Sequence, residues 1–231
     1  MKLISRAILI AAASLVLAAP SFAAKKASKG SAGQAAANSS DVDAVEQAYH
    51  SLTDLTARFV QTTEVALVER TVVKKGTFQF KKGGKLRIAY DGKGGKVYVS
   101  DGTTLWVHVP GDEASLQTFR VSDETVPREA LSFLGGFGKL KKEFEVSSSD
   151  AFPEARPGTL ALRLVPLAGR KHYESLDALF GPDRLLSELV VKNASGNVSR
   201  YVFSEVKTNS GLPDKLFTLS SGKATPDTLP E

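Results

Sequence analysis

From Leu55 onward the chain is a succession of short segments in which β-branched and aromatic residues alternate with polar ones. Glycine, aspartate and asparagine separate these segments, as they do in the turns between strands. The segments, in chain order, are LTARFVQTTEVAL, TVVKKGTFQF, KLRIAY, KVYVS, TLWVHV, KEFEVSSS, TLALRLVP, SLDALFG, LLSELVVKN and VSRYVFSEVKT, with a last short strand expected in LPDKLFTLSS. This order predicts antiparallel strands and excludes the regular alternation of strands and helices that builds a parallel sheet.

The number of predicted strands limits the shape that the sheet can take. One antiparallel sheet of about 10–11 strands rarely stays open and flat, so it must curl. No segment repeats at a fixed period as it would in a propeller or a solenoid. We therefore predict a mainly β (α+β) fold, a strongly curved and incomplete antiparallel barrel that forms one domain over residues 41–231.

Helical patterns occur in three places. In the first, Asp41 is placed as an N-cap before apolar residues that recur every three or four positions. In the second, VPREALSFLGGFGKL predicts a short helix that stops at Gly135. LPDKLF predicts a further helical turn near the C-terminus. The apolar positions of the first helix are Val42, Val45, Tyr49 and Leu52.

The N-terminus has the pattern of a secretory signal peptide. Lys2 and Arg6 precede a short apolar run over residues 7–19, which is shorter than the roughly 20 residues that span a bilayer. Small residues favour cleavage after Ala23, so residues 1–23 are predicted to be removed. Residues 24–40, rich in Ala, Ser, Gly and Lys, are predicted to form a disordered leader. The chain has no cysteine for a disulfide or an acyl anchor, and we expect a soluble exported protein.

The charge of the chain gives no sign of a nucleic-acid partner. Of 30 basic residues, Lys2 and Arg6 lie in the predicted signal peptide, and the remaining 28 against 25 acidic residues leave a net charge of about +3. Nucleic-acid-binding domains are usually much more basic. We expect no nucleic acid among the partners.

Catalytic and metal-binding patterns are missing from the sequence. His50, His108 and His172 are far apart, and none has a second ligand at metal spacing. The chain has no G-x-S-x-G elbow and no S-x-x-K motif. GGFGKL lacks the spacing of a phosphate-binding loop and has Leu140 where a hydroxyl is needed. We expect no metal, no cofactor and no enzymatic activity.

Alternation within the strands assigns side chains to faces. Asp101-Gly102 is the expected turn of a hairpin, and we expect this turn to place Val97, Val99, Leu105 and Val107 on one face. Trp106 should then point to the opposite face.

Five segments, taken in order, resemble the LolA family, the periplasmic carriers of bacterial outer-membrane lipoproteins. LTARFVQ contains the family's F-x-Q pattern at Phe59 and Gln61, and VSDGTTLWVHVP resembles its hairpin through Asp101-Gly102 and Trp106. The other three segments are GTFQFKKGGKLRIAY, LALRLVP and YVFSEVKTNSGLPDKLFTL.

The resemblance implies a fold and a function. Helices would form a lid over an apolar cavity in the incomplete barrel, and the cavity would hold the acyl chains of lipoproteins. The implied partners are acylated lipoproteins, an ABC transporter in the inner membrane that releases them, and an acceptor lipoprotein in the outer membrane. The carrier is expected to be a periplasmic monomer that binds no nucleotide.

The resemblance also implies roles for particular residues. The lid would carry Leu131, Phe133, Leu134 and Phe137, with Gly135 and Gly136 as its hinge. The family's lid-holding Arg-Pro is here Lys82-Gly83, which makes Lys82 the candidate latch. The predicted cavity residues are Phe59, Phe78, Phe80, Leu86, Ile88, Tyr90, Val97, Val99, Leu105, Val107, Leu162 and Leu164.

Two other functions remain open from the sequence. One is a lipid- or lipoprotein-sensing interaction domain with a similar half-barrel, and the other is an exported hydrolase with dispersed catalytic residues. The apolar residues could also form an ordinary packed core.

Overall fold

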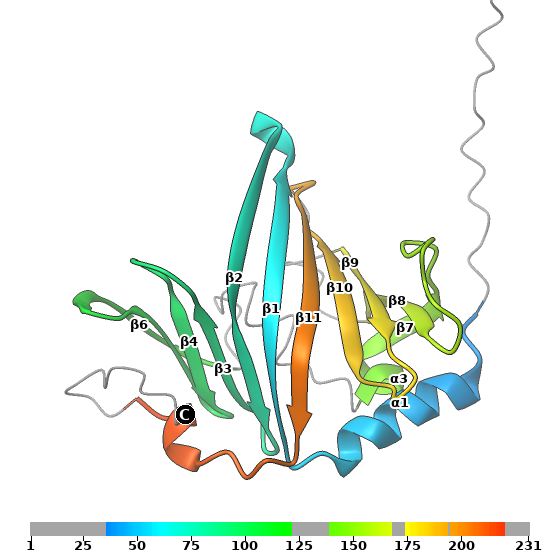
Figure 1. Ribbon diagram of the computed structural model, residues 1–231, viewed down its shortest axis with the longest axis horizontal. Helices are drawn as coiled ribbons and strands as arrows, with labels where there is room; N and C mark the ends of the chain where they lie inside the picture. The colour runs from blue at the N-terminus through cyan, green and yellow to red at the C-terminus, as the bar shows by residue number, and fades with distance from the viewer. Residues whose placement is uncertain (1–35, 122–138, 168–173, 194, 220–231) are drawn as a thin grey trace, which may run out of the picture. The chain divides into compact units, whose positions relative to one another are not determined.

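Eleven strands form one antiparallel sheet in the computed structural model, which describes residues 36–121, 139–167, 174–193 and 195–219 (Figure 1). The strand order is β6-β5-β4-β3-β2-β1-β11-β10-β9-β8-β7. Two meanders therefore meet where the first strand pairs with the last, and the sheet curves between its open edges, β6 and β7. The predicted mainly β fold, a curved and incomplete barrel, is confirmed.

The strands and helices have the following bounds. The strands are β1 (Asp54–Val65), β2 (Arg70–Lys81), β3 (Lys85–Tyr90), β4 (Val97–Asp101), β5 (Thr104–Val109), β6 (Asp112–Arg120), β7 (Phe144–Ser148), β8 (Leu160–Pro166), β9 (Ser175–Phe180), β10 (Leu186–Lys192) and β11 (Val198–Thr208). The helical elements are α1 (Ser39–Ser51), α3 (Leu140–Glu143) and the 3-10 turns η1 (Ala66–Val68) and η3 (Asp214–Phe217).

The first helix starts earlier than its sequence pattern predicted. The N-cap is Asn38, whose side-chain oxygen accepts a hydrogen bond from the backbone N–H of Ser40 at 3.1 Å, and Asp41 lies within the first turn. Ala36 forms a β-bridge with Ser147, so part of the predicted leader belongs to the fold. The apolar stripe of α1 is as predicted, because Val42 and Val45 are buried.

Two strand predictions were wrong. β6 was not among the predicted strands, and the sequence pattern missed it because seven of its nine residues are exposed, as is usual at a sheet edge. The short strand expected after the last helical turn is absent at Thr218 and Leu219, the described residues there. The predicted middle helix falls mostly outside the described residues.

β8 and β9 are joined by an ion pair with a buried carboxylate, on the face of the sheet opposite to Leu162 and Leu164. Arg163 donates to both oxygens of Asp177, at 2.7 and 3.0 Å, and the hydroxyl of Ser149 donates to the same carboxylate at 2.6 Å. Asp177 is only 5% exposed. The fork geometry satisfies a carboxylate that would otherwise be costly to bury.

No helix within the described segments is both long and apolar enough to cross a bilayer.

Candidate functional site

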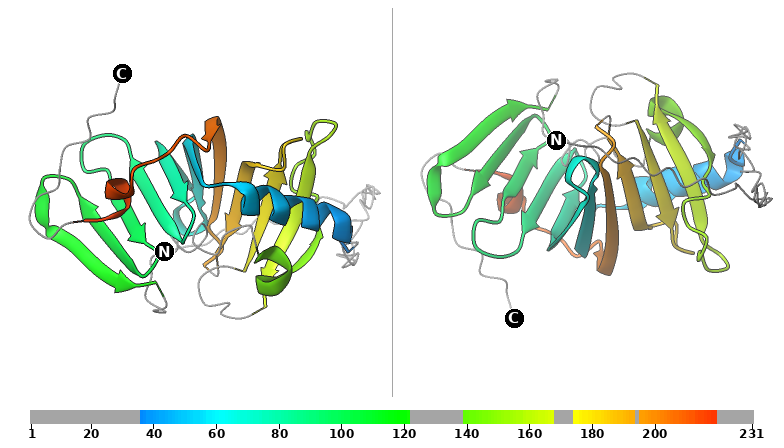
Figure 2. Two further views of the ribbon diagram at one scale, coloured as in Figure 1. Left: turned by 90° about the horizontal axis from the view of Figure 1, so that it is seen from below. Right: turned by 90° about the horizontal axis from the view of Figure 1, so that it is seen from above.

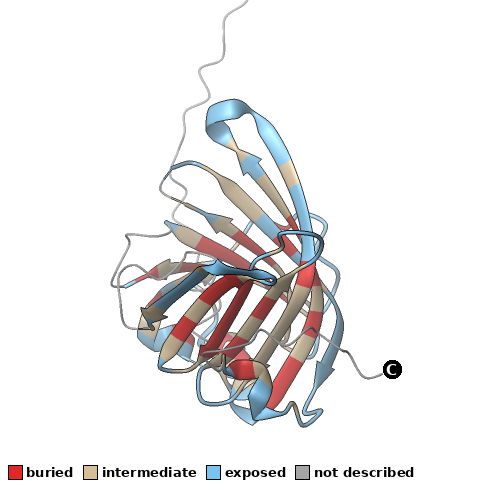
Figure 3. Ribbon diagram, turned by 90° about the vertical axis from the view of Figure 1, so that its left-hand side faces the viewer, coloured by how far each residue is buried: buried red, intermediate tan, exposed pale blue. Residues whose placement is uncertain are grey.

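One face of the sheet, here called the inner face, carries apolar side chains on each of the eleven strands. Residues paired across antiparallel strands share a face, so the register can be followed from Phe78 to Ile88 in one direction and from Phe59 to Phe203 in the other. Together with Val42 and Val45 of α1, most of these side chains form a single cluster. The buried residues are coloured red along the strands in Figure 3. The helix and the sheet therefore share one core.

Ten of the twelve predicted cavity residues lie on the inner face. Nine belong to the main cluster or pack on its margin, and Phe80 packs beside Leu52 and Leu55 in a smaller cluster at the start of β1. The ten are Phe59, Phe78, Phe80, Leu86, Ile88, Tyr90, Leu105, Val107, Leu162 and Leu164.

The placement of Val97 and Val99 on this face was wrong. The tight turn after Asp101 pairs Ser100 with Leu105, so odd positions of β4 share a face with even positions of β5. Val97 and Val99 therefore lie with His108 and Trp106 on the outer face, while Tyr98 takes the inner position. Trp106 points away from Leu105, as predicted.

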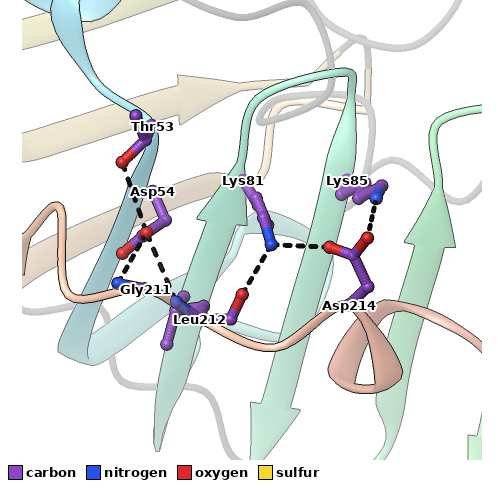
Figure 4. Close-up of polar contacts among 7 residues, drawn as sticks. All are labelled: Thr53, Asp54, Lys81, Lys85, Gly211, Leu212 and Asp214. Carbon is purple, nitrogen blue, oxygen red and sulfur yellow. Dashed lines mark hydrogen bonds and ion pairs between the residues drawn. The ribbon is translucent and has the colours of Figure 1, made fainter.

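A C-terminal segment, residues 209–217, covers the outer face beside β3 and β4. We call it the strap; its 3-10 turn η3 contacts both strands, as Figure 2 shows. Phe217 in that turn is completely buried, and so is Val99. Lys81 and Lys85 bind Asp214 at 2.6 and 3.0 Å (Figure 4).

Asp54 fixes the other end of the strap. Asp54 is 1% exposed, and its carboxylate accepts hydrogen bonds from the backbone N–H of Gly211 at 2.9 Å and of Leu212 at 3.3 Å (Figure 4). It also accepts hydrogen bonds from the backbone N–H of Ser210 at 2.9 Å and from the Ser210 hydroxyl at 3.0 Å. Burial alone would raise the pKa of Asp54, but these hydrogen bonds together outweigh it and hold the pKa below its ordinary value.

Several inner-face residues were not predicted from the sequence. They lie mostly on the second meander, where the sequence analysis recognised the strands but chose only Leu162 and Leu164. Strand alternation, followed through each pair, would have found them. They are Leu55, Tyr98, Phe119, Phe144, Val146, Leu160, Leu176, Ala178, Phe180, Leu186, Leu189, Val191, Tyr201 and Phe203.

Phe59 lies at the junction of the two meanders. Its ring meets Tyr90 edge-on at 5.3 Å between centroids and lies 6.1 and 6.5 Å from Tyr201 and Phe203. Gly76 pairs with Phe59 and leaves the space that the ring occupies. A cluster of aromatic rings therefore connects both halves of the inner face.

Gly76→Ala should destabilise the protein by about 1–3 kcal/mol, as overpacking does. An added methyl group would collide with the Phe59 ring and the carbonyl oxygen of Ala89, and the carbonyl cannot rotate away. Urea unfolding measures the effect. Gly181→Ala is the control, because its methyl group would meet chiefly the Asp183 carboxylate, which can rotate. Equal losses in both variants would contradict the packing described here.

The inner face becomes polar toward the β1–β2 turn. Tyr90 donates to the side-chain oxygen of Gln61 at 2.7 Å, and the Gln61 amide donates to Thr63 at 3.0 Å. The Thr63 hydroxyl lies 2.8 Å from that of Ser199. Gln61 is buried with its polar groups satisfied, so this network marks the end of the apolar surface.

Lys82, the predicted latch, reaches the first helix. Its ammonium donates to the backbone carbonyl of His50 at 3.3 Å, in the last turn of α1, where a positive charge is favourable. The predicted lid residues Leu131, Phe133, Leu134 and Phe137 and the hinge glycines Gly135 and Gly136 lie outside the described residues. Whether Lys82 holds a lid stays a prediction.

The two histidines that the structure describes do not form a metal site. Nowhere in the described segments do three or more His, Cys, Asp or Glu side chains gather as metal ligands would. His108 is buried on the outer face, and its pKa is lowered first by burial and then by the positive charge of Arg87. It is therefore neutral at pH 7. His172 lies outside the described residues.

The sequence profile of the family described as outer membrane lipoprotein carrier protein LolA matches residues 50–220, from the last turn of α1 to beyond the strap. The chain belongs to the LolA family. This match confirms the resemblance found in the sequence. The family is described as one of carrier proteins.

Two outer-membrane lipoprotein carrier proteins are similar in sequence to this chain. An outer-membrane lipoprotein carrier protein of Nitrosomonas europaea is 26% identical over 148 residues, which are 63% of this chain and 69% of that protein. One of Methylibium petroleiphilum is 26% identical over 161 residues, 70% of this chain and 75% of that protein. A solved LolA superfamily protein from Nitrosomonas europaea matches with a TM-score of 0.47 and 14% identity, covering 78% of this chain and 96% of that one.

Proposed function

We propose that this protein is a periplasmic carrier that binds the acyl chains of lipoproteins on the inner face of its sheet. It receives them from an inner-membrane ABC transporter and delivers them to the outer membrane, where an acceptor lipoprotein takes them when one is present. The observation that carries the proposal is an inner face to which each of the eleven strands contributes apolar side chains, in a chain of the LolA family.

The physical requirement for such a carrier is simple. Exposing an acyl chain to water costs about 0.8 kcal/mol for each CH₂ group, so a lipoprotein does not cross an aqueous compartment unaided. An apolar face on a curved sheet that is open between β6 and β7 can cover the chains. The carrier must also release its cargo, which a lid that occupies the same surface would assist by competing for it.

Lipoprotein release from spheroplasts tests the proposal. The purified protein should bring acylated lipoproteins into the supernatant, and mass spectrometry of the complex should identify a lipidated N-terminal cysteine in the cargo. Supernatants without lipoproteins would reject the carrier function. Turnover of ester substrates in place of release would identify a hydrolase, and stable binding to an envelope protein without release would identify a sensing domain.

Leu134→Asp should weaken binding of a fluorescent fatty acid or an acylated lipoprotein by about tenfold or more, because a carboxylate in an acyl-binding lid must be desolvated. Leu116→Asp is the matched control, since Leu116 on the edge strand β6 is 45% exposed. Circular dichroism verifies that both variants fold. Unchanged binding in Leu134→Asp would remove the lid from the proposal.

A further inference from the structure

The turn between β1 and β2 presents aliphatic side chains to water at the far end of the longest hairpin. Leu67 is 93% exposed, Val68 is 61% exposed and Val73, on the adjoining part of β2, is 59% exposed. Leu67 and Val68 are the most exposed large apolar residues among those that the structure describes, together with Leu167. Exposed apolar side chains that gather in one place usually mark an interaction surface.

The hairpin projects beyond its neighbours. β3 pairs with β2 only between Gly76 and Lys81, so residues 70–75 of β2 extend beyond it. On the other side β11 follows β1 as far as Glu64, and the turn after Val65 extends beyond it (Figure 1). The 3-10 turn that follows is held in place, because the N–H of Ala66 donates to the side chain of Asn197 at 3.0 Å. We call residues 65–73 the hairpin tip.

Basic residues surround the hairpin tip. Arg70, Lys74 and Lys75 are exposed on β2, and Lys93 and Lys96 are exposed in the turn after β3. This turn lies at the same end of the sheet, because Tyr90 of β3 pairs with Gly76. The acidic residues in and next to the hairpin tip are Glu64 and Glu69, so these five basic residues stand against two acidic ones. Asp91, also in that turn, is bound by Arg58.

We propose that the hairpin tip inserts Leu67 and Val68 into the surface of a bilayer that contains anionic phospholipid. This combination of projecting aliphatic side chains and flanking positive charge is typical of peripheral membrane contact. A protein partner fits less well, because the tip is convex and lacks the tryptophan and tyrosine that dominate protein interfaces.

The position of the tip gives the contact a purpose, an argument that rests on the proposed carrier function. β1 and β2 carry both the tip and part of the inner face, with Phe59 and Phe78 on the same two strands. A tip in the bilayer surface therefore orients this apolar face toward the lipid, with the polar network of Gln61 between them. Acyl chains would then move between protein and membrane with little exposure to water.

Flotation with lipid vesicles tests the membrane contact. The full chain should float with vesicles of phosphatidylethanolamine and phosphatidylglycerol, and more weakly with vesicles of phosphatidylcholine alone or at high salt. Leu67→Asp should reduce binding about tenfold, because a carboxylate is costly to insert into a bilayer. Leu116→Asp should float like the wild type. The full chain has a basic and apolar N-terminal segment that could itself bind vesicles. Both variants keep this segment, so a difference in flotation between them reports on the tip alone.

A second variant separates the charge from the apolar contact. Lys74→Glu/Lys75→Glu should lose the preference for phosphatidylglycerol and keep the weak binding to phosphatidylcholine. No flotation of the wild type, or equal flotation of Leu67→Asp and Leu116→Asp, would overturn the inference. So would loss of a cross-linked protein partner in Leu67→Asp without any change in flotation.

Fatty-acid binding, measured without vesicles, keeps this inference distinct from the carrier function. Leu67→Asp should bind a fluorescent fatty acid as well as the wild type does, because the tip lies outside the inner-face clusters. A wild type that binds fatty acid but not vesicles would overturn the membrane contact and leave the carrier function standing. A wild type that binds vesicles but no fatty acid would overturn the carrier function and leave the membrane contact standing.

Discussion

The Asp54→Asn variant is expected to have a free energy of unfolding about 3 kcal/mol lower than that of the wild type. The wild-type carboxylate is buried and accepts four hydrogen bonds from Ser210, Gly211 and Leu212. The amide of asparagine would turn N–H groups toward backbone N–H donors and leave some of them without an acceptor. Urea unfolding measures the loss, which corresponds to a decrease in Tm of roughly 10 °C for a domain of this size.

The loss caused by Asp54→Asn should depend on pH. The pKa of Asp54 in the folded protein lies below its ordinary value of about 3.9, so the carboxylate contributes stability above that value and loses the contribution as the pH falls further. The difference between wild type and variant should be constant from pH 8 to about pH 5 and should shrink toward pH 3. Asp214 titrates in both proteins and cancels in the comparison.

Asp91→Asn is the matched control for Asp54. Asp91 pairs with Arg58, but its side chain is 45% exposed and the pair is screened by water. Asp91→Asn should lower the free energy of unfolding by less than about 1 kcal/mol, and the strap should stay attached in this variant. A similar cost for the two substitutions would show that the strap does not depend on the buried carboxylate.

Arg163→Met is expected to destabilise the protein by about 2–4 kcal/mol, because it leaves the Asp177 carboxylate buried with Ser149 as its remaining side-chain donor. This destabilisation is smaller than that expected for a fully buried pair, since the Arg163 side chain is 32% exposed. Thermal and urea unfolding both measure it. Arg58→Met, which breaks the more exposed pair with Asp91, should cost less than about 1 kcal/mol.

The double variant Arg163→Met/Asp177→Leu should recover most of that stability. Replacing both partners removes the unpaired charge, and apolar residues of similar volume often substitute for a buried ion pair at little cost. The double-mutant cycle therefore should give a coupling of at least about 2 kcal/mol. Additive losses would mean that Asp177 is satisfied without Arg163.

Local pattern was enough to predict most of the fold. Ten strands, from β1 to β5 and from β7 to β11, follow segments whose β-branched and aromatic residues already alternate in the sequence. β6 was missed because an edge strand needs little apolar surface, and its Leu116 and Phe119 are separated by polar residues. The helix cap at Asn38 was missed because Asp41 is an equally good capping residue by type.

The candidate site could be predicted strand by strand but not across strands. The predicted cavity residues Leu86 and Ile88 share a face, as do Leu162 and Leu164, because alternation within a single strand requires it. Alternation failed for Val97 and Val99, because the length of the turn decides which positions of two neighbouring strands share a face. Here the turn places odd positions of β4 beside even positions of β5. Asp54 gave no signal at all, since its partner Ser210 is 156 residues away in the sequence.

The pairing of β1 with β11 has a consequence for the order in which the chain folds. Each meander consists of hairpins between consecutive strands, which form from local contacts. The pairing of Phe59 with Phe203, by contrast, joins strands that are far apart in the sequence. Contacts between such distant segments form late, because the closure of a long loop precedes any gain from them. A nascent chain that ends before Val198 therefore carries β1 as an open edge beside an uncovered aromatic cluster. Until its last strand is made, this protein resembles the apolar cargo that we propose it carries.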